Sequence, residues 1–73
     1  MSPHPGCGQR AALLEGIRVA MSAIIALNNR EMEAVLGGKL DELEALGAEL
    51  REQRQLKEDL LYAYRSHVQS HGC

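Results

Sequence analysis

The sequence predicts an all-α fold, in which an antiparallel hairpin of two long helices self-associates into a four-helix bundle. Three observations support this prediction. Both prolines, Pro3 and Pro5, precede the helical region, so residues 6–73 contain no helix breaker other than glycine. Apolar residues recur at helical spacing on both sides of Gly37-Gly38. A connection this short between long helices makes them antiparallel neighbours.

The elements follow one another in a simple order. Residues 1–8 are rich in proline and glycine and are expected to be irregular, and residues 9–73 form the hairpin. The first helix is expected at about 9–36. Glycines at 37–38 supply the left-handed backbone that ends a helix, and the second helix follows at about 39–70. At about 1.5 Å per residue the helices are roughly 40–48 Å long, so they can pair along their whole length.

Composition limits the size and nature of the core. The 73 residues include no Trp or Phe, and the formal net charge is −2. Chains this short expose much of their surface, and a lone two-helix hairpin is only marginally stable. The core must therefore be aliphatic, and the balanced charge argues against nucleic-acid binding.

The most apolar stretch, residues 11–27, contains Glu15 and Arg18 and spans only 17 residues. That length is short for a transmembrane helix, and the charged pair interrupts the apolar region that a secretory signal needs. We therefore expect no membrane partner, and a cytoplasmic protein.

The first helix is apolar around most of its circumference. One apolar row consists of Leu14, Ile17, Met21, Ile24, Ile25, Met32 and Val35. A second row consists of Leu13, Ala20, Ile24 and Leu27. A hairpin covers only one row, so the other needs a partner, and the simplest partner is a second copy of the chain. The residues expected at this oligomer interface are Leu13, Ile17, Ala20, Ile24 and Leu27.

Halfway along the second helix, residues 51–55 are entirely polar. If the turn is centred on the two glycines, residue i of the first helix lies near residue 75−i of the second, which places Asn28 beside this region. One interpretation is a solvated helix face with a buried Asn28 that fixes the register. The other is a pocket lined by Asn28, Arg51 and Arg54 at an oligomer interface, which binds a small anionic, nucleotide-like ligand.

All histidines and cysteines lie near the two ends of the chain: His4, Cys7, His67, His71 and Cys73. His67 and His71 are four residues apart, so on a helix they can bind one metal ion together. The hairpin brings both ends close, and four of the five side chains would complete a structural zinc site. Two alternatives remain open. Cys7 and Cys73 form a disulfide, or the five residues occupy an irregular segment and a fraying last turn without a shared role.

The sequence contains no pattern that indicates catalysis. Gly37-Gly38-Lys39 lacks the spacing of a phosphate-binding loop. Every histidine is terminal, so no Ser/His/Asp arrangement can be assembled. We expect a protein that is not an enzyme and has no cofactor other than the zinc ion considered above.

Two family resemblances add to these expectations. The stretch from Glu31 to Leu60, EMEAVLGGKLDELEALGAELREQRQLKEDL, resembles the helical hairpins of flagellar and type III secretion chaperones. The whole-chain layout is similar to that of the Rop family, small RNA-binding hairpins that dimerise into four-helix bundles. This chain lacks a basic face, so RNA binding is not expected. The resemblances imply a chaperone-like binding role and a dimer.

Together these features predict a small non-enzymatic interaction or oligomerisation module, either a scaffold or a chaperone-like binding protein, which forms a homodimer. A zinc-binding mini-protein and an oligomer that sequesters an anionic ligand are the two alternatives.

Overall fold

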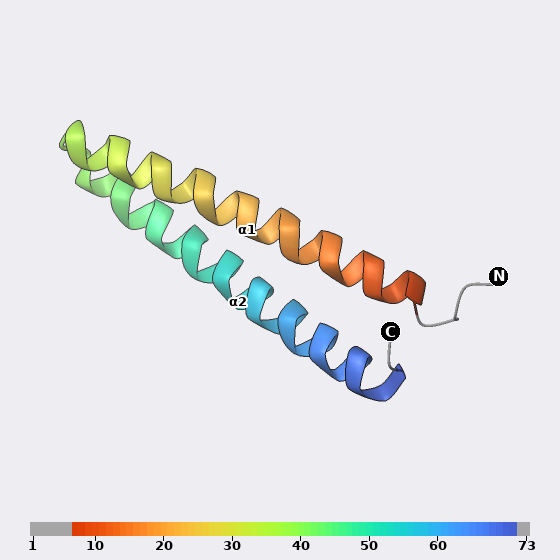
Figure 1. Cartoon of the computed structure of the whole chain (residues 1–73). Helices are drawn as coiled ribbons and strands as arrows, with labels where there is room; N and C mark the ends of the chain where they lie inside the picture. Colours follow the sequence, from red (N-terminus) through yellow and green to blue (C-terminus); the bar gives the residue numbers. More distant parts are fainter. Residues whose placement is uncertain (1–6, 72–73) are drawn as a thin grey trace.

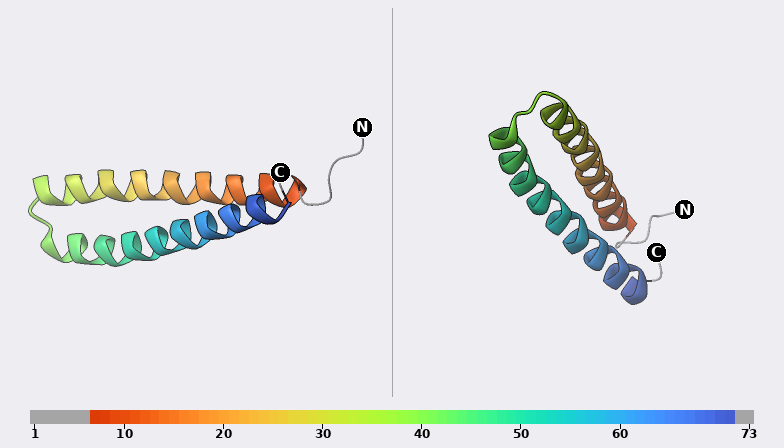
Figure 2. Two further views of the ribbon diagram at one scale, coloured as in Figure 1. Left: turned by 60° about the horizontal axis from the view of Figure 1, so that its bottom comes forward. Right: turned by 90° about the vertical axis from the view of Figure 1, so that its left-hand side faces the viewer.

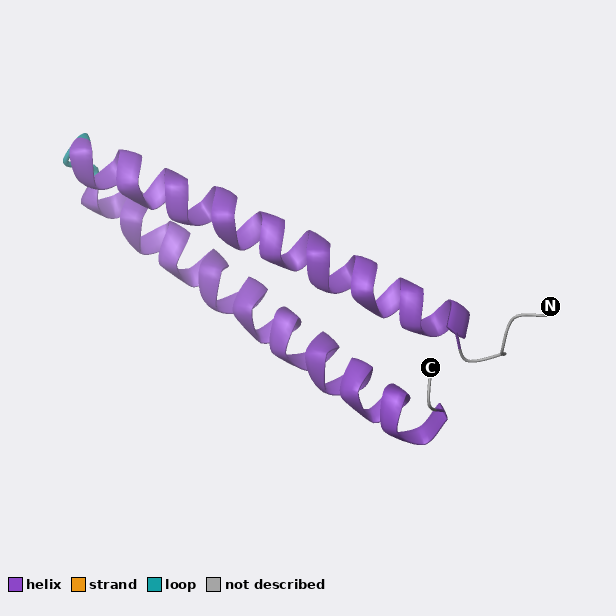
Figure 3. Ribbon diagram, viewed as in Figure 1, coloured by secondary structure: helices purple, strands orange, loops and turns teal. Residues whose placement is uncertain are grey.

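The computed structural model describes residues 7–71, with the side chains of residues 8–70. Within that range the chain forms two helices, α1 (Cys7–Leu36) and α2 (Leu40–His71), and is helical apart from the turn (Figure 3). The helices pack side by side and antiparallel, so that the start of α1 lies beside the end of α2 (Figures 1 and 2). The predicted all-α architecture of two packed helices is confirmed.

The helix bounds lie within two residues of those expected. α1 begins at Cys7, so that Cys7 and Gly8 belong to the helix and not to the irregular segment. The last proline, Pro5, lies before Cys7, and nothing in the sequence after it prevents a helix from starting. The rest of the expected irregular segment, residues 1–6, lies outside the described residues.

A Schellman motif ends α1. Gly38 has a φ of +68°, the left-handed conformation that glycine adopts without steric cost. The N–H of Lys39 donates to the carbonyl of Ala34 at 2.8 Å, and the N–H of Gly38 donates to that of Val35 at 3.1 Å. These two bonds define the motif and satisfy carbonyls that the helix end would otherwise leave open. Of the two turn glycines, Gly38 is the one whose backbone requires glycine.

All the buried side chains that the structure describes, and many of the half-buried ones, recur at alternating intervals of three and four along the two helices. On α1 they are Leu13, Ile17, Ala20, Ile24, Leu27, Glu31 and Ala34. On α2 they are Leu43, Leu46, Leu50, Gln53, Lys57, Leu60, Tyr64 and His67. This spacing is the seven-residue repeat of a coiled coil. We call these two rows the seam, and the hairpin is an antiparallel coiled coil.

The aliphatic centre of the seam lies in the half nearer the turn. It consists of Leu27, Ala34, Leu46 and Leu50, with Ile24 and Leu43 packed against them. Towards the other end, the Arg10 guanidinium lies 5.9 Å from the centre of the Tyr64 ring. Gly16 packs against Leu60, because a Cβ on Gly16 would lie 3.2 Å from the Leu60 Cδ1. Both contacts lie within one residue of the predicted register.

Candidate interaction surface

The five residues expected at an oligomer interface lie in the hairpin's own seam. Ile17, Ala20 and Leu27 are only 8%, 1% and 7% exposed, and Leu13 and Ile24 are half-buried. In a single chain, α2 therefore covers these residues.

The row of α1 that was expected to contact a second copy thus packs on α2, and the other apolar row is left uncovered. The row through Leu14 and Met21 does not close the hairpin. It includes Arg18 and Asn28 at seam spacing, and both side chains are exposed in the hairpin. The row that does pack on α2 has the small residue Ala20 at its middle instead, which lets the helices approach closely.

An apolar row on α1 remains uncovered in the single chain. It consists of Leu14 (38% exposed), Met21 (49%), Ile25 (61%), Met32 (63%) and Val35 (55%). Together with Arg18 and Asn28, these residues each follow a seam position by one place, so they repeat with the same coiled-coil spacing. We call the five apolar residues the α1 stripe. Its spacing matches that of a second helix-packing seam.

Arg18, the one charged residue at stripe spacing, is paired with a residue outside the stripe. Its Nε donates to Glu15 Oε2 at 2.9 Å, and its Nη2 donates to Glu15 Oε1 at 2.6 Å. This side-chain hydrogen bonding lowers the pKa of the Glu15 carboxyl below its ordinary value and raises the pKa of Arg18. Glu15 lies on the outer polar row of α1, so the guanidinium is neutralised at the edge of the stripe.

The α1 stripe continues onto α2. In an antiparallel pair, residues that follow the seam by one place lie on the same side of both helices. On α2 these are Glu44, Gly47, Arg51, Arg54, Glu58, Leu61, Arg65 and Val68, and Leu40 continues the same spacing towards the turn. Leu40 is 70% exposed, while Leu61 and Val68 are half-buried. We call this side of the hairpin, with the α1 stripe, the apolar face. Its apolar residues lie mainly on α1, and on α2 charged residues lie between Leu40, Leu61 and Val68.

The opposite side of the hairpin is less apolar. It carries Glu42 and Glu49 on α2, and Arg30 with the small residue Ala23 on α1. Its exposed large apolar residues are Val19, at 53%, and Leu56, at 45%. It therefore lacks a continuous row like the α1 stripe.

The three residues of the expected polar patch, Asn28, Arg51 and Arg54, are all exposed. The prediction that Asn28 is buried and fixes the register within the chain is wrong. Asn28 follows the seam residue Leu27 by one place, which turns its side chain towards the apolar face. A single hairpin does not enclose these three side chains, and a ligand pocket between copies stays a prediction.

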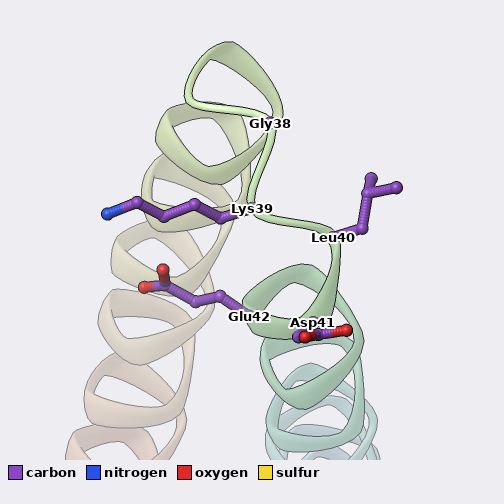
Figure 4. A pocket seen from close by; sticks show the side chains of 5 residues that line it. All are labelled: Gly38, Lys39, Leu40, Asp41 and Glu42. Atoms are coloured by element: carbon purple, nitrogen blue, oxygen red, sulfur yellow. The ribbon is translucent and has the colours of Figure 1, made fainter.

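A surface depression of about 430 Å³ lies at the turn, lined by Gly38, Lys39, Leu40, Asp41 and Glu42. These are five consecutive exposed residues, and Leu40 extends in the opposite direction to Lys39 and Glu42 (Figure 4). The depression is the outer surface of the turn, and no side chains converge in it on a common point.

The terminal cluster is only partly described. His4 and Cys73 lie outside the described residues, as do the side chains of Cys7 and His71. His67 is 6% exposed and occupies a seam position of α2. Within residues 7–71, no three or more His, Cys, Asp or Glu side chains that the structure describes gather in a way that could hold a metal ion. The zinc site and the disulfide both stay predictions.

By length and composition alone, residues Gly8–Leu36 could cross a membrane. The expectation against a span considered only the shorter stretch 11–27. In the hairpin, however, α2 packs along α1 and carries eleven charged residues, seven acidic and four basic. A hydrocarbon core does not accommodate such a helix. A membrane-spanning α1 and this hairpin therefore exclude each other.

No protein family, curated protein or solved structure matches the chain. The resemblances to secretion chaperones and to the Rop family thus rest on the sequence features alone. The surface of the hairpin is the remaining guide to function.

Proposed function

We propose that this chain is a non-enzymatic helical interaction module that associates with a second copy of itself through the apolar face. The dimer serves as a scaffold or a chaperone-like binding protein. The observation that carries the proposal is the α1 stripe, in which five large apolar side chains remain 38–63% exposed at coiled-coil spacing. Exposed apolar rows of this kind are typical of binding surfaces.

The thin core of the single chain supports the proposal. Among the described residues, six hydrophobic residues are buried, and two of them are alanines. Such a core rarely provides more than a few kcal/mol of net stability. Covering a large aliphatic side chain completely contributes about 1.5–3 kcal/mol. The five stripe residues are 38–63% exposed, so covering the rest of each would add several kcal/mol in total.

The apolar face is also large enough for a stable interface. The Cα atoms of the hairpin extend 56 × 19 × 11 Å, so each broad side covers on the order of 1,000 Å². A standard protein interface buries about 800 Å² on each partner. One broad side per copy therefore suffices for a specific dimer.

Sedimentation equilibrium over a range of concentrations tests this function. We expect a mass of twice the 8.0 kDa of the chain, with circular dichroism showing a helical protein. A stably helical monomer of 8.0 kDa would contradict the proposal.

A lipid surface is the competing partner for the α1 stripe. We propose a cytoplasmic module whose hairpin stays closed, so the protein should remain in the supernatant when phosphatidylcholine vesicles are pelleted. Co-sedimentation with the vesicles, with the helicity retained, would show that the stripe meets lipid and not a second copy.

A further inference from the structure

We infer that the two copies meet across a two-fold axis that crosses the apolar face near Ile25, with α1 of one copy antiparallel to α1 of the other. This inference rests on the proposed self-association and adds its geometry. Two hairpins stacked face to face have two symmetric arrangements. An axis across the helices pairs α1 with α1 and α2 with α2, and an axis along the helices pairs α1 with α2 of the second copy.

The ends of the apolar face match each other when the axis crosses the helices near Ile25. Leu14 and Val35 lie about equally far from Ile25, roughly 15–17 Å along the helix. Leu14 of one copy therefore faces Val35 of the other. On α2 the same axis passes near residues 50–51, and Leu40 then faces Leu61 of the second copy. The outermost layer at each end of the interface is therefore apolar.

Arg54 and Asn28 favour one of the two arrangements. With the axis across the helices, Arg54 faces Gly47 of the second copy and shares a layer with Asn28 of that copy, whose amide oxygen can accept its hydrogen bond. The space is available, because a Cβ on Gly47 would meet nothing within 4 Å. The two Arg54 residues are then one heptad apart, about 10 Å. With the axis along the helices, both Arg54 side chains fall in one layer, and two like charges would be buried together.

The α1 stripe favours the same arrangement. With the axis across the helices, Ile25 contacts Ile25 of the second copy, and the α1 stripes of the two copies pack against each other. With the axis along the helices, Ile25 would face Arg51, and Met32 would face Glu44. The preferred arrangement does bring Arg51 near Arg51, and Glu44 near Glu58, of the second copy. Repulsion between charges at the exposed rim is weak compared with the burial of the stripe.

Disulfide cross-linking tests the geometry, in chains in which Cys7→Ser and Cys73→Ser remove the native thiols. Ile25→Cys should form a covalent dimer under mild oxidation, since the two copies of residue 25 meet at the axis within the 4.4–6.8 Å Cα separation that a disulfide needs. Leu14→Cys should not cross-link with itself, because its two copies lie roughly 32 Å apart. A mixture of Leu14→Cys and Val35→Cys chains should cross-link. Val19→Cys, on the opposite side, is the matched control that should stay reduced.

The outcomes separate the geometry from the proposed function. If sedimentation shows a dimer but Ile25→Cys does not cross-link, the inferred axis is overturned while self-association stands. Cross-linking in a mixture of Leu14→Cys and Leu61→Cys chains would identify the axis along the helices instead. If the unmodified chain is a monomer, both the geometry and the proposed function are rejected.

Discussion

At the scale of single residues, the glycines of the hairpin differ in what a methyl group at each position would meet. Gly38 has a positive φ that other residues adopt only with strain, although the space around it is open. Gly47 lies inside α2 with no atom within 4 Å of an added Cβ. The first position depends on glycine because of its backbone, and the second does not.

Alanine at these two positions should therefore shift stability in opposite directions. Gly38→Ala should destabilise the protein by about 1–2 kcal/mol, the cost of a left-handed non-glycine residue. Gly47→Ala should stabilise it by roughly 0.5–1 kcal/mol, because alanine favours the helix. Urea unfolding followed by circular dichroism measures both changes. Shifts of the same sign would contradict this account of the turn and of α2.

Residue patterns also show how far the sequence could predict a site. The exposed Asn28, Arg51 and Arg54 lie on the same side of the hairpin as the α1 stripe, and the sequence located them without indicating which way they point. Asn28 lies one position after the seam residue Leu27, and this difference is enough to place it outside the seam. The choice between a seam position and its neighbour depends on contacts with the second helix, which the spacing within one helix does not determine.

At the scale of the helices, the turn and the pairing could be predicted, and the buried row of α1 could not. Two adjacent glycines and the change of apolar pattern located the turn, and the register followed from it. α1 offers two apolar rows of equal spacing because most of its circumference is apolar. The packing partner decides between them: the leucine row of α2 meets the row with Ala20, while the other row contains Arg18.

The seam on α2 contributes to stability chiefly near the turn. Leu46 is 2% exposed, within the aliphatic cluster, whereas Leu36 at the end of α1 is 81% exposed. Leu46→Ala should lower the free energy of unfolding by about 2–5 kcal/mol, through lost burial and the cavity left behind. Leu36→Ala is the matched control and should change it by less than about 0.5 kcal/mol. Equal effects of the two substitutions in urea unfolding would show that the seam is placed wrongly.

At the scale of the whole molecule, the hairpin is long and thin, with one broad side more apolar than the other. The four-helix bundle stays a prediction. The central claim is that the α1 stripe, and not the opposite side, is the contact between copies. Two exposed positions of α1 separate these sides: Ile25 in the stripe, 61% exposed, and Val19 on the opposite side, 53% exposed.

Sedimentation equilibrium of Ile25→Glu and Val19→Glu tests the claim most directly. Both variants replace an exposed aliphatic residue of the same helix with glutamate, so they change charge and helix propensity alike. We predict that Val19→Glu keeps a mass of twice 8.0 kDa, while Ile25→Glu dissociates to the 8.0 kDa chain because the substitution places two carboxylates at the two-fold axis. If Ile25→Glu remains a dimer, or Val19→Glu dissociates as readily, the α1 stripe is not the contact between copies.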